Sequence, residues 1–147
     1  MLKNLDPVLS PDLLQILRAM GHGDRIAIVD GNYPADNHAA RLVRLDGLTA
    51  TRVLDAILSV MPLDPPEFVP ETAWRMQVVG APPETRQPIF DEFDALLAKH
   101  EGQSVKLASL ERFAFYEAVK GAYAVVSTGE ARLYGNIILQ KGVIRPT

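Results

Sequence analysis

Short apolar runs that alternate with longer amphipathic segments constrain the fold of this chain more than any other feature. Residues 26–29, Ile-Ala-Ile-Val, are apolar on successive positions, which is typical of a strand covered on both faces. Residues 74–79 alternate apolar and polar side chains instead, as a half-buried strand does. On such patterns the sequence predicts short strands at residues 26–29, 42–45, 74–79, 105–107, 123–127 and 136–140.

Helices are predicted between these strands. Ser10 precedes Pro11 and Asp12, and a hydroxyl followed by proline and a carboxylate is a typical helix start. Ser109 is predicted to cap a later helix in the same way. Residues 32–41 contain proline, asparagine and aspartate and are predicted as a loop. The predicted helices span residues 11–20, 51–61, 89–99 and about 110–120.

Strands that alternate with helices predict an α/β fold. We expect a layered domain with a mixed, largely parallel sheet covered by helices on both faces. The 147 residues match the usual length of one domain, so a single domain over residues 1–147 is expected. The order of the strands does not follow from the pattern.

The composition excludes several classes of protein. No cysteine is present, which excludes disulfides, thiolate nucleophiles and thiolate metal sites. A formal net charge of −3 with dispersed basic residues argues against a nucleic-acid partner. No apolar run reaches the ~18 residues of a membrane-spanning helix. A signal peptide needs an unbroken apolar stretch, whereas proline and aspartate interrupt the apolar residues of the N-terminal segment. We therefore expect a cytoplasmic protein with no membrane contact.

Motifs for nucleotides and metals are missing. The Gly21-His22-Gly23 turn lacks the G-x-G-x-x-G spacing, and its predicted position between a helix and a following strand is the reverse of a dinucleotide motif. Asp30 and His38 are two scattered candidate ligands, whereas zinc sites use three or four. We therefore expect no cofactor and no metal.

Several polar residues stand at the ends of apolar segments, where α/β sheets form their ligand crevices. Three of these residues also have a purely structural explanation. His22 can be a solvated turn residue, Asp30 before a glycine can stabilise a turn, and Tyr116 near two phenylalanines can pack in the core. From the residues alone, the chain is an α/β domain suited to a small polar ligand. The candidates are His22, Asp30, Arg112, Tyr116, Tyr134 and Asn136.

Two long stretches resemble one known family. The N-terminal stretch MLKNLDPVLSPDLLQILRAMGHGDRIAIVDGNYPA combines a leucine-rich helix, a Gly-His-Gly-Asp turn and a strand that ends in aspartate. The C-terminal stretch SLERFAFYEAVKGAYAVVSTGEARLYGNIILQKGVI contains the runs R-F-A-F-Y-E and Y-G-N-I-I-L. The chain resembles the ribose pyranase/fucose mutarotase family on these residues, with residues 62–103 the least similar. The R-F-A-F-Y-E run resembles the fucose mutarotase branch.

The resemblance implies an isomerase that interconverts the α and β anomers of L-fucose without a cofactor. His22 corresponds to the catalytic proton donor, and imidazole can give and take a proton near neutral pH. Tyr134 is the candidate for the second acid–base group. Asp30 is a candidate for the carboxylate that orients the imidazole.

The resemblance also implies a set of sugar contacts. Arg112 can offer forked donors to neighbouring hydroxyls, and an asparagine can donate and accept at once. Glu71 lies near the position of an acidic residue of the family and is a weaker candidate. The implied substrate-binding residues are Asp30, Arg112, Tyr116, Tyr134, Gly135 and Asn136.

Two alternatives to a fucose mutarotase stay open. One is a ribose pyranase, which uses the same acid–base logic on another sugar. The other is a regulatory subunit that binds a monosaccharide without turnover. The family forms ring-like oligomers with sites between neighbouring subunits, so a homo-oligomer is expected in either enzymatic case.

Overall fold

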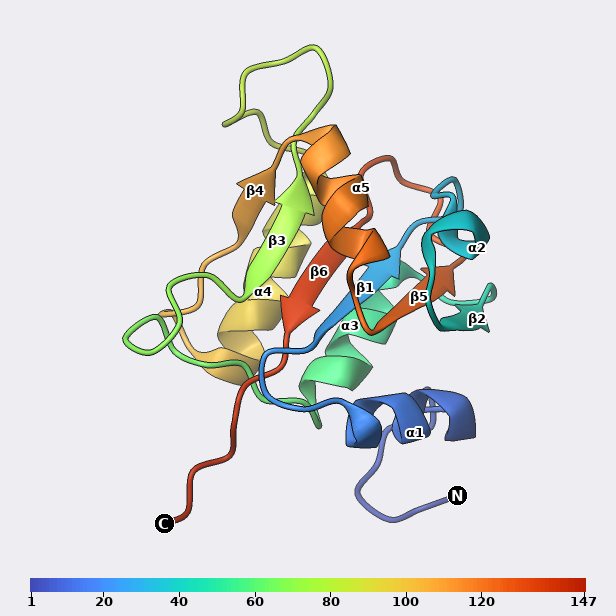
Figure 1. The fold of residues 1–147 in the computed structure, drawn as a ribbon, viewed down its shortest axis with the longest axis vertical. Helices are drawn as coiled ribbons and strands as arrows, with labels where there is room; N and C mark the ends of the chain where they lie inside the picture. Colours follow the sequence, from blue (N-terminus) through green and yellow to red (C-terminus); the bar gives the residue numbers. More distant parts are fainter.

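A six-stranded mixed sheet forms the centre of the structure, a computed structural model that describes residues 1–147 (Figure 1). The strands are β1 (Arg25–Val29), β2 (Leu42–Leu45), β3 (Ala73–Met76), β4 (Ala108–Leu110), β5 (Ala124–Thr128) and β6 (Ile137–Gln140), in the order β2-β5-β1-β6-β3-β4. β6 runs antiparallel to both of its neighbours, β1 and β3, whereas the other pairs are parallel. The predicted mixed, largely parallel sheet is confirmed.

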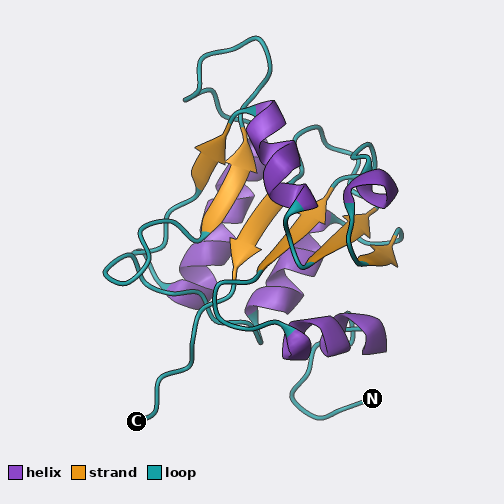
Figure 2. Ribbon diagram, viewed as in Figure 1, coloured by secondary structure: helices purple, strands orange, loops and turns teal.

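Helices cover both faces of the sheet, as Figure 2 shows. The helices are α1 (Pro11–Ala19), α2 (Ala35–His38), α3 (Ala50–Leu58), α4 (Pro88–Glu101) and α5 (Arg112–Lys120). α1, α3 and α4 pack in a large core on one face, while α2 and α5 pack in a smaller core on the other. No helix is both long and apolar enough to span a membrane.

The central position of β1 in the sheet explains why its residues 26–29 are all apolar. Ile26 and Ile28 pack into the large core, while Ala27 and Val29 pack into the smaller one. All four side chains are fully buried because successive side chains of a strand point to opposite faces and both faces are covered. β1 pairs with β5 on one side and β6 on the other, so its position and direction are fixed.

Some predictions of local structure are wrong. Residues 32–41 were expected to form a loop, but Ala35–His38 form the one-turn helix α2, which packs against α5. The strand expected at residues 105–107 lies instead at Ala108–Leu110, where it pairs with β3 at the edge of the sheet.

The shift of β4 also moves the cap of α5. Ser109 lies within the strand, and Glu111 caps the helix by accepting the N–H groups of Phe113 and Ala114 at 2.9 and 3.1 Å. Ser10 caps α1 as predicted, since its hydroxyl accepts the N–H of Leu13 at 3.3 Å. A carboxylate at the positive end of the helix dipole serves as well as a hydroxyl.

Candidate functional site

A small pocket with a mixed polar and apolar lining opens at the end of the sheet where β1 ends. Its volume is ≈ 240 Å³, slightly below the ~300–1,000 Å³ of drug-sized ligand sites and so suited to a small ligand. The end of β1, the first turn of α5 and the loop before β6 all contribute to it. Five residues predicted from the sequence line this pocket together: Asp30, Arg112, Tyr116, Tyr134 and Asn136.

Asp30 and Asn136 form a reciprocal pair on the pocket floor. The Asp30 N–H donates to Oδ1 of Asn136 at 2.8 Å, and Nδ2 of Asn136 donates to the Asp30 carboxylate at 3.2 Å. The carboxylate also accepts the N–H of Asn32 at 2.9 Å. This pair ties the end of β1 to the start of β6, so the two residues are fixed by the pairing of the central strands.

Burial dominates the electrostatics of Asp30. Only 5% of the residue is exposed, and this burial raises the pKa of its carboxyl although the hydrogen bonds from Asn32 and Asn136 act in the opposite direction. A buried carboxylate is a strong acceptor for hydroxyl groups that reach it.

Tyr134 holds an unusual backbone conformation. Its φ is 62°, in the left-handed region that residues other than glycine rarely adopt. Its hydroxyl accepts the N–H of Val79 at 3.0 Å, which joins the loop before β6 to the segment after β3. Strained residues of this kind concentrate at functional sites, and here the strain places a phenol in the pocket.

Gly135 and Glu130 shape the loop that carries Tyr134. A side chain at Gly135 would place its Cβ 2.7 Å from Cγ of Glu130, so the close packing requires glycine. The buried Glu130 carboxylate accepts the backbone N–H groups of Arg132 and of Ala50 at the start of α3. Sequence reasoning missed Glu130, because nothing in the pattern links it to a helix 80 residues away.

α5 supplies one wall of the pocket. Arg112 and Tyr116 are one helical turn apart, so their side chains lie on the same face of the helix. The Arg112 guanidinium stacks 4.6 Å from the centre of the Phe113 ring, and the Tyr116 ring meets that of Tyr33 edge-on at 5.5 Å. The pocket therefore combines a cationic donor with aromatic surface opposite the Asp30 carboxylate.

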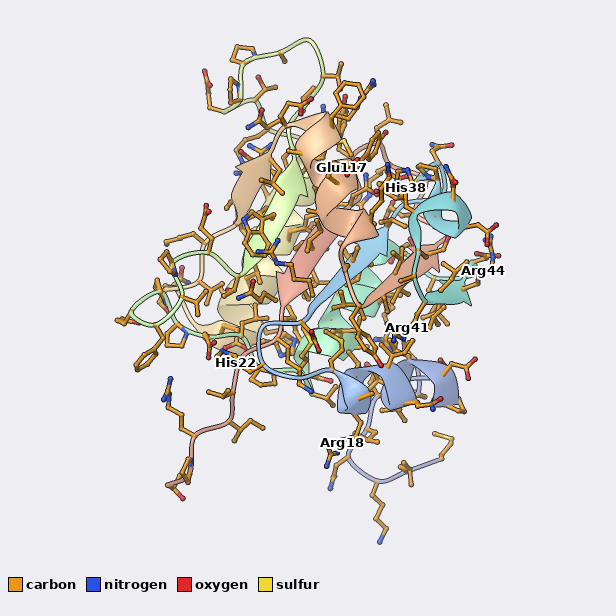
Figure 3. All side chains as sticks on the ribbon, in the orientation of Figure 1. Arg18, His22, His38, Arg41, Arg44 and Glu117 are labelled. Atoms are coloured by element: carbon orange, nitrogen blue, oxygen red, sulfur yellow. The ribbon has the colours of Figure 1, made fainter.

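His22 lies at the other end of the sheet. It precedes β1 while Asp30 follows it, so the five residues of β1 separate them by about 17 Å. Figure 3 places His22 near the start of β1 and His38 near its end. Within one chain, His22 and the pocket are therefore not brought together.

Asp64, and not Asp30, is the carboxylate that holds His22. Nε2 of His22 lies 2.6 Å from Oδ2 of Asp64, whose side chain is 3% exposed while that of His22 is 54% exposed. The carboxylate favours the tautomer with hydrogen on Nε2, which leaves Nδ1 able to accept a proton. The expectation that Asp30 orients this imidazole is wrong. Asp64 was missed because it lies 42 positions away in the proline-rich stretch.

Glu71 also lies away from the pocket. It precedes β3, which runs parallel to β1, because both strands are antiparallel to β6. Glu71 is exposed and stands at the same end of the sheet as His22. Both residues therefore lie apart from the pocket, at the opposite end of the sheet.

Apolar side chains are exposed at both ends of the sheet. Val79 and Leu133 line the pocket and are 53% and 65% exposed. At the other end, Val143 donates its N–H to Asp64, and the neighbouring Ile144 is 82% exposed. Exposed apolar side chains of this kind mark surfaces that can meet a partner.

Comparison with known proteins decides the family. Residues 3–144 match the profile of the family described as RbsD / FucU transport protein family. The chain belongs to this family. A fucose mutarotase of Homo sapiens is 42% identical over 148 residues, covering 97% of this chain and 94% of the relative. An L-fucose mutarotase of Actinobacillus pleuropneumoniae is 40% identical over 144 residues, 97% of each chain.

Solved structures of RbsD / FucU proteins share the fold. A fucose mutarotase of Streptococcus pneumoniae in complex with L-fucose matches with a TM-score of 0.87 and 40% identity, over 98% of this chain and all of that one. RbsD of Bacillus subtilis in complex with D-ribose matches with a TM-score of 0.74 and 24% identity, over 99% of this chain and all of that one. At that identity the RbsD match shows only the fold.

Gly135→Ala should disrupt the pocket loop. The new Cβ meets Glu130 at a distance that real contacts do not reach, and overpacking of this kind costs about 1–3 kcal/mol of stability. Urea unfolding should show this loss. Gly47→Ala is the matched control, because a Cβ at Gly47 has no atom within 4 Å. Equal stability of the two variants would contradict the role given to Gly135.

Proposed function

We propose that the chain is a cofactor-independent L-fucose mutarotase, an isomerase that interconverts the α and β anomers. Relatives at 40–42% identity over nearly their full length carry this name. The observation that carries the proposal is the convergence of five implied site residues, from three distant parts of the sequence, on one small pocket.

The pocket's own groups explain how a monosaccharide is held. The Asp30 carboxylate accepts sugar hydroxyl groups, and the planar fork of Arg112 donates to neighbouring ones. Asn136 holds Asp30 in place, since both ends of its side-chain amide are hydrogen-bonded to that residue. Each amide end keeps one further site for a sugar hydroxyl.

The reaction needs two proton transfers at the anomeric centre. A base removes the anomeric hydroxyl proton while an acid protonates the ring oxygen, so the bond between C1 and the ring oxygen breaks. Rotation about C1–C2 and the reverse transfers close the ring on the other face of the carbonyl. His22 and Tyr134 are the two groups suited to these transfers. In this assignment, Asp64 orients the imidazole of His22, and Val79 holds the hydroxyl of Tyr134.

The complete site requires two copies of the chain. His22 lies about one strand length from the pocket of its own chain, so another copy must supply the imidazole. Exposed apolar side chains border both the pocket and the His22 end. An interface that joins two different ends of the molecule is heterologous and generates a closed ring when its rotation closes.

In this proposal residues 1–147 act as one domain, and a cytoplasmic location stays a prediction.

Saturation-transfer NMR tests the activity directly. With L-fucose at equilibrium, irradiation of one anomer should reduce the signal of the other when the chain is added. D-ribose and D-galactose should exchange less, and EDTA should leave the L-fucose exchange unchanged because no step uses a metal. Exchange with ribose alone would favour a pyranase. Binding of L-fucose without exchange would favour a regulatory subunit.

His22→Ala should lose most of the L-fucose exchange. A positioned acid or base contributes about 10²–10⁴-fold, so the exchange rate should fall within that range while circular dichroism stays unchanged. His100→Ala is the matched control, because His100 bonds to Asp55 between α3 and α4 and neither lines the pocket nor bonds to His22. A folded His22→Ala protein with the wild-type rate would refute the role of His22.

A further inference from the structure

Three aromatic rings meet beside the pocket, and only one of them, Tyr116, is among the substrate-binding residues implied by the sequence. Tyr33 and Tyr116 line the pocket, and His38 packs behind both from the end of α2. The His38 ring meets Tyr33 at 5.4 Å and Tyr116 at 5.1 Å between ring centres, both edge-on. The two tyrosines meet each other at 5.5 Å in the same way. The three rings therefore support one another.

A hydrogen bond joins two members of this cluster. The Tyr33 hydroxyl lies 2.9 Å from Nδ1 of His38. Burial lowers the pKa of His38 and raises the pKa of Tyr33, so the imidazole is neutral and the phenol is protonated at neutral pH. With the imidazole hydrogen on Nε2, Tyr33 is the donor and Nδ1 the acceptor. The phenol oxygen keeps its lone pairs for another partner.

The charged groups around His38 leave its imidazole neutral. Lys120 on α5 disfavours the charged imidazole, while Glu117 on the same helix favours it more weakly. Asp36 lies on α2 itself and is exposed. Asp30 acts on Tyr33 and further disfavours loss of its proton. The neutral imidazole and the protonated phenol thus follow from burial together with the neighbouring charges.

We infer that His38 is a positioning residue of the sugar site, which fixes the Tyr33 hydroxyl so that its oxygen accepts a hydrogen bond from a substrate hydroxyl. Together with the Asp30 carboxylate, Tyr33 makes one side of the pocket an acceptor, while Arg112 makes the α5 side a donor. The inference rests on the proposed function, because it needs a polyhydroxylated substrate in this pocket. It adds a substrate contact, Tyr33, and a group that acts through it, His38.

Two substitutions of His38 separate the hydrogen bond from ring packing. His38→Asn keeps an acceptor near the position of Nδ1 and removes the ring, while His38→Phe keeps a ring and removes the acceptor. Our inference predicts that His38→Phe raises the KM for L-fucose about three- to tenfold, the usual effect of one hydrogen bond. His38→Asn should stay within about twofold of wild type, and kcat should be unchanged in both.

A purely structural role of His38 predicts the reverse order. His38→Phe would then be harmless, and His38→Asn would lower stability and activity together. Either that order or an unchanged KM in His38→Phe would overturn the inference.

A further variant tests the coupling of the two residues. Tyr33→Phe should raise the KM as His38→Phe does, and the double variant should be no worse than Tyr33→Phe alone, because His38 acts only through that hydroxyl. Additive effects would overturn the inference. His100→Gln is the histidine control and should leave KM unchanged. If the wild-type chain fails to exchange L-fucose anomers at all, the proposed function fails, which is a separate outcome from any of these.

Discussion

The fixed position of β1 is the constraint on which the rest of the structure depends. It pairs with β5 and β6, and both of its faces are buried, so its register and direction are specified. His22 stands before it and Asp30 after it. In the proposed mechanism, which uses both residues, two molecules must therefore come together, and oligomerisation becomes a chemical requirement of that proposal.

The same strand makes the pocket rigid. Asp30 is tied to Asn136 across the antiparallel pair of β1 and β6. The loop before β6 is anchored by Glu130, which reaches the first turn of α3 and also binds Arg132. This anchoring supports the strained backbone of Tyr134. A pocket built on paired strands in this way needs little reorganisation when it binds a ligand, as the proposed function requires.

The sequence predicted those features that depend on local pattern. The apolar run of β1 marked a strand covered on both faces, and Ser10 marked the start of α1. The five residues that gather in the pocket were identified by position at segment ends and by resemblance, and the fold brings them together.

Features that depend on long-range contacts could not be predicted in this way. Asp64 pairs with His22 across 42 positions, and Glu130 reaches Ala50 across 80. α2 is only one turn long, and it is stabilised by packing against α5 more than by its own sequence. For the same reason His38 looked like an isolated histidine in a loop, whereas in the fold it supports Tyr33.

The most direct test of the central claim is subunit complementation. His22→Ala removes the imidazole at one end of the chain, and Arg112→Glu spoils the pocket at the other by placing a second carboxyl group near Asp30. Each variant alone should be nearly inactive in L-fucose anomer exchange. In mixed oligomers assembled by co-expression, about a quarter of the interfaces combine an intact His22 with an intact pocket. The exchange rate should therefore return to about a quarter of the wild-type rate. Mixed oligomers that are verified by native mass spectrometry and stay inactive would contradict a site shared between copies.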